Sequence, residues 1–336
     1  MTNNKNKTNT RLKFALCLFV MVLFFAAPIE AKVTRYLTGN KGDVNPPLAG
    51  PAHDLGGGGT DVDVAIQWMI DEVRGCTGCA AKVDVVVLRS SGSNGYNDYI
   101  YAMNGVDSIE TLVITASRDA NTASVETTVR NAEVVFFAGG DQCDYVKNFR
   151  GTKVETAVES VYARGGGTGG TSAGLAIQGE FTYDACTGSV TSSQALLDPY
   201  HRYISFTYDF FNWANLNDVI TDSHFVTRDR MGRTMAFVAR QIRDGRAASA
   251  LGLAVNEKTS VVVDKNGLAR VIGDGPAYFV LGDHVPEVCE AGKPLTHSNF
   301  KIWKIANGGT FDLRNRPTVG YYTVSVNNGL LSSDPY

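Results

Sequence analysis

The sequence lacks an apolar run long enough to cross a membrane. Its longest such run is FALCLFVMVLFFAA, and a spanning helix needs roughly 20 apolar residues. This run follows the basic stretch MTNNKNKTNTRLK and precedes PIEA. Because that order is typical of a secretory signal peptide, we expect residues 1–31 to be one, cleaved after Ala31. An uncleaved anchor is the alternative. Cys17 lies inside the apolar run, which argues against a lipoprotein. The mature chain is expected to be exported, to the periplasm or the medium.

The chain also lacks an excess of positive charge. Its formal net charge is −3, and loss of residues 1–31, with four basic and one acidic side chain, takes it to −6. An acidic protein is a poor ligand for nucleic-acid phosphates, so nucleic-acid binding is not expected. The 305 residues that remain suffice for one large domain or two small ones.

Cysteine is scarce, and the five that follow the signal are Cys76, Cys79, Cys143, Cys186 and Cys289. No second Cys or His pair stands at zinc-ligand spacing, so no metal is predicted. An oxidising compartment permits disulfides. Cys76 and Cys79 are spaced to close a short loop. The sequence does not determine the other pairing; we expect Cys186 to pair with Cys289 and Cys143 to be the free thiol.

Strand and helix patterns alternate through the middle of the chain. Apolar runs of strand length occupy residues 83–90, 112–117 and 134–140, and helical patterns occupy residues 61–75 and 144–166. This alternation predicts an α/β fold with a mainly parallel sheet flanked by helices. Beyond residue 251 the pattern becomes strands joined by turns. We therefore expect an α/β domain over residues 32–283 and a β-rich extension over 284–336, packed on the same domain.

The glycine-rich run GGGTGGTSAGLAIQG, residues 165–179, allows three interpretations. Gly165, Gly167 and Gly170 satisfy G-x-G-x-x-G, but the preceding segment looks helical and no Lys follows, which disfavours a nucleotide loop. A flexible linker at this place would divide the alternating strand and helix pattern, which disfavours that interpretation. The match to G-x-S-x-G predicts instead a strand-to-helix turn that exposes Ser172 as a nucleophile. A second glycine corner, Gly139-Gly140, follows a buried strand and is placed to face the same ligand.

A serine nucleophile needs a base, and the residues alone leave the choice open. The histidines are His53, His201, His224, His284 and His297. His224 follows an apolar strand-like stretch, whereas a Ser–acid–His order would use His284 or His297. Three arginines, Arg228, Arg230 and Arg233, come soon after His224. In an acidic chain they suggest an anionic substrate, although a solvated helix face is the plain alternative.

Four blocks, FFAGGDQ, GGTSAG, DSHFVTRDRMGR and GLAVNE, together resemble the cyanophycinase and dipeptidase-E-like serine peptidases, in the order that this family has. The resemblance covers about residues 50–283 and implies a fold like that of class I glutamine amidotransferases, with no cofactor. It implies Ser172 as nucleophile, His224 as base and Glu257 as orienting acid. The oxyanion donors would be Gly140 and Ala173, and the pocket would be lined by Gln142, Asp222, Arg228, Arg230 and Arg233.

The resemblance also implies a substrate, cyanophycin, which is a poly-aspartate chain with arginine on each side-chain carboxyl. The product would be the β-Asp-Arg dipeptide, with the pocket arginines holding a carboxylate and Asp222 a guanidinium. Ser223 stands where the polymer-cleaving enzymes usually carry glutamine. GGGTGG replaces the usual apolar strand, so we expect that strand to be short or irregular. An aspartyl or isoaspartyl dipeptidase, or a catalytically silent binding protein, are the alternatives. After signal cleavage no membrane partner is expected. The sequence leaves open whether the protein forms a homodimer.

Overall fold

The computed structural model describes residues 1–2 and 33–336. Apart from its first two residues, the expected signal peptide with its cleavage site lies outside the described residues. The described residues from Val33 onward belong to one compact unit. Within the described part of the chain, no helix is both long and apolar enough to span a bilayer.

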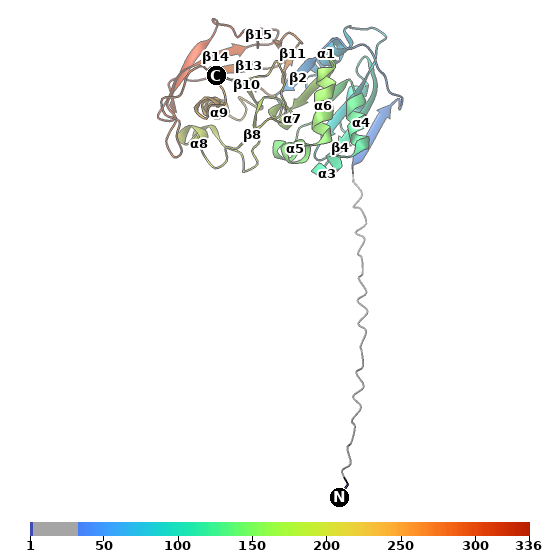
Figure 1. Ribbon diagram of the computed structural model, residues 1–336. Helices are drawn as coiled ribbons and strands as arrows, with labels where there is room; N and C mark the ends of the chain where they lie inside the picture. Colours follow the sequence, from blue (N-terminus) through green and yellow to red (C-terminus); the bar gives the residue numbers. More distant parts are fainter. Residues whose placement is uncertain (3–32) are drawn as a thin grey trace. The chain divides into compact units, whose positions relative to one another are not determined.

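The first sheet has the parallel core that the alternation predicts, so the expected α/β fold class is confirmed (Figure 1). Its strands, in spatial order, are β1 (Thr34–Gly39), β4 (Val106–Val113), β3 (Val83–Arg89), β5 (Val134–Phe137), β6 (Gly167–Thr171), β2 (Ala52–Gly56), β11 (Thr259–Val263), β12 (Leu268–Gly273) and β15 (Thr310–Asp312). The five from β4 to β2 run parallel, and the outer strands pair antiparallel. The parallel strands therefore bring their carboxyl ends to one edge.

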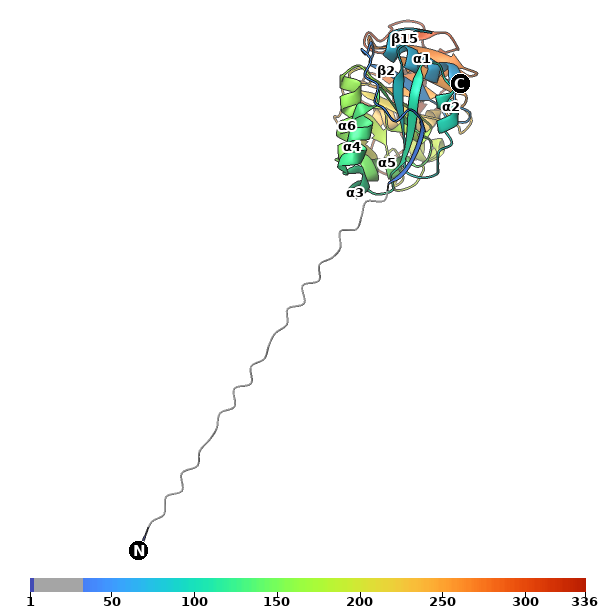
Figure 2. The same cartoon turned by 90° about the vertical axis from the view of Figure 1, so that its right-hand side faces the viewer.

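Helices cover both faces of this sheet (Figure 2). They are α1 (Asp63–Arg74), α2 (Asn97–Tyr101), α3 (Ser117–Ala120), α4 (Ala123–Asn131), α5 (Gln142–Phe149) and α6 (Lys153–Ala163). The buried stripe of α1 packs with Val85 and Val87 of β3, whereas α4 and α6 pack with Val86 and Leu88. Alternate residues of β3 thus pack on opposite faces of the sheet, which explains why the strand is apolar from Val85 to Leu88.

The second sheet contains most of the β-rich C-terminal part. Its order is β17 (Leu330–Leu331), β16 (Tyr322–Asn327), β14 (His297–Ile305), β13 (Ala277–Gly282), β10 (Ala250–Val255), β9 (Val219–Asp222), β7 (Phe181–Tyr183) and β8 (Phe206–Tyr208). Only β10, β9 and β7 run parallel to one another. The helices α8 (Ser192–Leu197) and α9 (Met231–Arg243) contact each other, and α9 packs on this sheet. Strands from residues 284–336 enter both sheets; the domain division at residue 284 stays a prediction.

The glycine-rich strand is regular, contrary to our expectation of a short or irregular one. All five residues of β6 are buried, and they pair with β5 on one side and β2 on the other. A Cβ at Gly169 would lie 2.6 Å from the carbonyl oxygen of Asp54, and one at Gly167 would lie 3.0 Å from Cγ of Met69 on α1. The glycines are needed because neighbouring backbone and α1 approach this strand too closely for side chains.

The disulfide pairing also differs from our expectation. Cys143 pairs with Cys186, and Cys289 is the free, buried thiol. Cys143 is the second residue of α5 and Cys186 follows β7, and their Cα atoms are 4.9 Å apart. Cys289 lies in the core of the second sheet, where burial raises its pKa to about 12. Cys76 and Cys79 form the short-loop bridge that their spacing suggested.

Candidate active site

Ser172 stands between β6 and a short helix, α7 (Ala173–Ala176). Its backbone has φ 55° and ψ −111°, a conformation rare for a residue with a side chain. A Cβ on Gly174 would lie 2.1 Å from the carbonyl oxygen of Phe137, and one on Gly170 would lie 2.7 Å from the same atom. The two glycines of G-x-S-x-G therefore let the strand and helix close up around the serine.

A continuous chain of hydrogen bonds joins the three predicted triad residues. Oγ of Ser172 lies 2.7 Å from Nε2 of His224, and Nδ1 of His224 lies 2.6 Å from Oε1 of Glu257. His224 follows β9 and Glu257 follows β10, two adjacent parallel strands of the second sheet. The site thus lies where the carboxyl ends of strands from both sheets meet, because Ser172 follows β6 of the first sheet.

The surroundings favour a neutral imidazole at His224. Burial lowers the pKa of His224, the bond to Glu257 opposes that shift, and the charges of Arg228 and Arg230 lower it further. The hydrogen bond from His224 lowers the pKa of Glu257, which is therefore ionised at neutral pH. A carboxylate at Nδ1 selects the tautomer with the proton there, which leaves Nε2 free to accept the serine proton.

Most of the predicted site residues line one small pocket. Its lining comprises Gly140, Gln142, Ser172, Ala173, Ala176, Tyr183, Thr221, Asp222, Ser223, His224, Arg228, Arg230 and Arg233. Of the ten residues predicted from sequence, only Glu257, behind the imidazole, is not among them. The backbone of Ala173 begins α7 directly after the serine. The Gly139–Gly140 corner approaches it too, since a Cβ on Gly139 would lie 3.6 Å from Cβ of Ser172. Both predicted oxyanion donors are therefore next to the nucleophile.

Asp222 is engaged in a buried ion pair, which differs from the expectation that it would hold a substrate guanidinium. Its oxygens accept from Nε and Nη2 of Arg233 at 2.8 and 2.5 Å, and from the hydroxyl of Thr234 at 2.9 Å. Nη1 of Arg230 lies 3.3 Å away. Burial opposes ionisation, but the charges of Arg233 and Arg230 and these hydrogen bonds lower the pKa of Asp222 overall. The pocket therefore presents net positive charge.

The other histidines lie elsewhere. The rings of His284 and His297 meet edge to face, with their centroids 4.6 Å apart, and His284 bonds to Asp283. Among the described residues neither lines the pocket nor bonds to Ser172, so a Ser–acid–His arrangement through them finds no support. His53 is buried in β2 beside Thr168, and burial lowers its pKa to about 3.

A glycine loop that sequence reasoning missed contacts all three triad segments. Residues 56–59, four consecutive glycines at the end of β2, form this loop. The carbonyl of Gly56 accepts from the N–H of Ser172 at 3.0 Å, that of Gly57 from His224 at 2.7 Å, and that of Gly58 from Lys258 at 2.9 Å. The signal was present, because four glycines after a buried strand mark a loop at the carboxyl edge. Tyr183, also missed, had no distinguishing sequence signal.

The predicted nucleophile, base and oxyanion donors line one pocket, and the predicted acid bonds to the base from behind it. On an α/β sheet this arrangement is that of a hydrolase of the serine peptidase class. Comparison with known proteins finds cyanophycinases among its relatives. The chain is 26% identical over 223 residues to the cyanophycinases of Nostoc sp. and Trichormus variabilis, covering 65% of this chain and 69% of each relative. At this level of identity the chain is a homologue of these cyanophycinases.

A solved structure shares the fold. The crystal structure of a peptidase from an acI-B1 Actinobacterium matches with a TM-score of 0.53 at 13% identity, covering 80% of this chain and 98% of that one. No family model matches the chain. In residues 1–2 and 33–336, no group of three or more His, Cys, Asp or Glu side chains is placed to hold a metal ion.

Proposed function

We propose that this protein is an exported serine exopeptidase of the cyanophycinase type. It hydrolyses the poly-aspartate backbone of cyanophycin to β-Asp-Arg dipeptides through a Ser172–His224–Glu257 triad. The observation that carries the proposal is the unbroken hydrogen-bonded chain from Oγ of Ser172 through the imidazole to Glu257. Homology to cyanophycinases supports the substrate class.

In the proposed reaction, Oγ of Ser172 attacks a peptide carbonyl carbon while Nε2 of His224 takes the hydroxyl proton. The N–H groups of Gly140 and Ala173 donate to the oxyanion that forms. The imidazolium, held by Glu257, then gives its proton to the leaving amine. Water then loses a proton to Nε2 of His224 as its oxygen bonds to the acyl carbon. When the bond from that carbon to Oγ of Ser172 breaks, the imidazolium returns the proton to Oγ, and the acid product leaves.

An aspartyl or isoaspartyl dipeptidase with the same triad is the second candidate. It is favoured by the pocket charge, because three arginines line the pocket and its one lining acid, Asp222, is already paired with Arg233. Such a pocket suits a free aspartyl carboxylate better than the guanidinium that decorates cyanophycin.

The test is to incubate the purified mature chain with cyanophycin granules, and separately with Asp-X and isoAsp-X dipeptides, and to identify soluble products by mass. Release of β-Asp-Arg from the polymer supports the first candidate; turnover of dipeptides alone supports the second. Ser172→Ala should lower turnover by roughly 10⁴–10⁶-fold with the fold retained. Substrate binding without labelling of Ser172 by an activated phosphonate would instead indicate a silent binding protein.

A further inference from the structure

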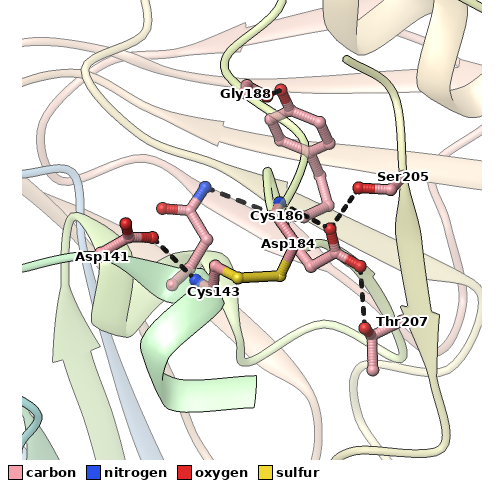
Figure 3. The surroundings of a disulfide bond; sticks show 9 residues. Asp141, Cys143, Asp184, Cys186, Gly188, Ser205 and Thr207 are labelled. Atoms are coloured by element: carbon pink, nitrogen blue, oxygen red, sulfur yellow. Dashed lines mark hydrogen bonds between the residues drawn. A yellow bond between two sulfur atoms is a disulfide. The ribbon is translucent and has the colours of Figure 1, made fainter. Parts of the chain in front are cut away.

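The Cys143–Cys186 disulfide joins two segments that each contribute a residue to the pocket lining (Figure 3). Cys143 is the second residue of α5 and follows the Gly139–Gly140 corner of the first sheet. Cys186 lies three residues beyond Tyr183, the last residue of β7 in the second sheet. Neither cysteine lines the pocket, but Gln142 and Tyr183 do. The covalent bond therefore links the segment that carries Gly140 and Gln142 to the segment that carries Tyr183.

The first segment is held firmly on its own sheet. Asp141 caps α5, its carboxylate accepting from the N–H of Cys143 at 2.9 Å. The hydroxyl of Tyr145, also on α5, donates to the carbonyl of Ala138 at 2.6 Å. Cys143 is buried. Any movement of its sulfur would consequently be transmitted to the glycine corner and to Gln142.

Asp184 holds the second segment through hydrogen bonds to its side chain. This carboxylate accepts from the N–H of Cys186 at 2.9 Å, from the hydroxyl of Thr207 on β8 at 2.9 Å, and from the hydroxyl of Ser205 (Figure 3). Ala185, between Asp184 and Cys186, has φ 51°. A residue with a side chain stays in that conformation only where its neighbours hold it, and the disulfide is one such restraint.

Non-covalent contact between the two segments is slight. Among the described residues, the only side-chain hydrogen bond between residues 139–149 and 181–190 runs from Nε2 of Gln142 to the carbonyl of Tyr183, at 3.5 Å. A bond at that distance is weak. The backbone of the triad segments, by contrast, is hydrogen-bonded to the glycine loop of residues 56–59.

We propose that the Cys143–Cys186 disulfide is a positioning element that sets the separation of Gln142 and Tyr183 and so fixes how substrate lies over Ser172. This inference rests on the proposed peptidase function. Loss of the bond widens the pocket and weakens substrate positioning, while the hydrogen bonds between Ser172, His224 and Glu257 persist.

The test compares the double variant Cys143→Ser/Cys186→Ser with the matched double variant Cys76→Ser/Cys79→Ser, whose bridge lies between α1 and β3. For each we measure kcat and KM on the substrate that the wild type cleaves, the rate of Ser172 labelling by a small phosphonate, and the melting temperature. We expect kcat/KM of the first variant to fall roughly 10- to 100-fold, mainly through KM. Labelling should stay within about twofold of wild type, since the triad persists. The control variant should keep wild-type kinetics.

Wild-type kcat and KM in a variant with a lowered melting temperature would overturn the proposal, because the bond would then only stabilise the fold. Loss of phosphonate labelling in a folded variant would overturn it too, since the triad itself would depend on the bond. The proteins with and without the Cys143–Cys186 bond are also compared in a Ser172→Ala background. There the affinities for β-Asp-Arg and for an Asp-X dipeptide are measured by calorimetry. Weaker binding after loss of the disulfide supports the proposal, and unchanged binding overturns it. This measurement does not need turnover, so it decides the positioning role even if the wild type cleaves no substrate and the peptidase function is refuted.

If the Cys143→Ser/Cys186→Ser variant does not fold, the Cys76→Ser/Cys79→Ser variant can be folded with its Cys143–Cys186 bond in place and then reduced. Cys186 is exposed, so dithiothreitol reaches the remaining bond. It supplies two electrons and two protons, forms its cyclic disulfide and leaves two thiols. A rise in KM on reduction, reversed by oxidised glutathione, supports the proposal, whereas unchanged kinetics with both thiols titrated overturns it.

Discussion

The imidazole of His224 rests directly on Gly58. A methyl group on the Cα of Gly58 would come 2.4 Å from Cε1 of the ring and 2.6 Å from Nε2, the atom that faces Ser172. Gly58 also has φ +96°, in the region that favours glycine. One missing side chain therefore lets the base take its place beside the predicted nucleophile.

Gly58→Ala is expected to displace the imidazole and lower kcat/KM by roughly 10²-fold or more, because small misplacements of a catalytic group are costly. Steady-state kinetics check this. Gly78→Ala is the matched control, since Gly78 has φ +72° but no atom within 4 Å of the added methyl. It carries the backbone strain without the collision, so equal losses in both variants would refute the positioning role.

Glu257→Gln is expected to lower kcat by roughly 10³–10⁴-fold, since an amide does not hold the imidazole in the required tautomer or stabilise the imidazolium. Single-turnover rates measure the effect. Glu290→Gln, which removes an exposed carboxylate paired with Lys293, should leave the rate unchanged. A Glu257→Gln enzyme with wild-type kcat would remove Glu257 from the triad.

Activity is expected to rise with pH as His224 loses its proton. Burial lowers the pKa of His224 below its ordinary value of 6.5, and the charges of Arg228 and Arg230 act in the same direction. The acidic limb of kcat/KM should therefore have its midpoint below pH 6.5. Arg228→Gln removes one of those charges and should move the midpoint upward. A midpoint above 6.5 in the wild type, or a downward shift in the variant, would contradict this assignment.

Asp222→Asn is expected to destabilise the fold by about 3–5 kcal/mol, because it leaves Arg233 buried without its carboxylate partner. Both side chains of this pair are only 4% exposed. Urea unfolding followed by circular dichroism gives the free energy. Asp283→Asn, at a more exposed pair with Lys301, should cost no more than about 1 kcal/mol. Similar losses of unfolding free energy at the two sites would show that the buried Asp222–Arg233 pair stabilises the fold no more than the exposed pair does.

The hydrogen bonds of Tyr336 allow a test of whether the β-rich extension supports the pocket. Its hydroxyl accepts from the N–H of Met231 at 3.0 Å and donates to Asp229 at 2.9 Å, at the end of the segment that carries Arg228 and Arg230. Tyr336→Phe should cost about 1 kcal/mol of stability and raise KM several-fold. Tyr321→Phe, whose hydroxyl has no hydrogen-bond partner in the described part of the chain, is the control. Unchanged KM in Tyr336→Phe would mean that the extension does not brace the pocket.

Local patterns allowed much of this to be predicted. The runs at residues 83–90 and 134–140 are mostly apolar because both faces of β3 and β5, which lie there, are covered. The G-x-S-x-G match predicted the turn at Ser172, because glycines at those two positions are a local steric requirement. The triad assignment came from resemblance in four separate blocks, since spacing alone did not select His224 over His284 or His297.

Other features depend on contacts between distant segments. The sequence of β6 suggested an irregular strand, because nothing local reveals that Met69 of α1 and the backbone at Asp54 approach it too closely for side chains. The pairing of Cys143 with Cys186 depends on α5 and β7 meeting across two sheets. The engagement of Asp222 by Arg233 likewise appears only once β9 and α9 have packed.

The sequence by itself determined the α/β class and the turn that presents Ser172, because these follow from short-range sterics and hydrophobic periodicity. The other predicted site residues came from the resemblance of four sequence blocks to a known family. Only the tertiary structure decided which cysteines bond, which charges are neutralised within the pocket, and why four glycines stand at residues 56–59. Those outcomes are set by distances between segments far apart in the chain, and hydrophobic packing of the two sheets fixes such distances all at once.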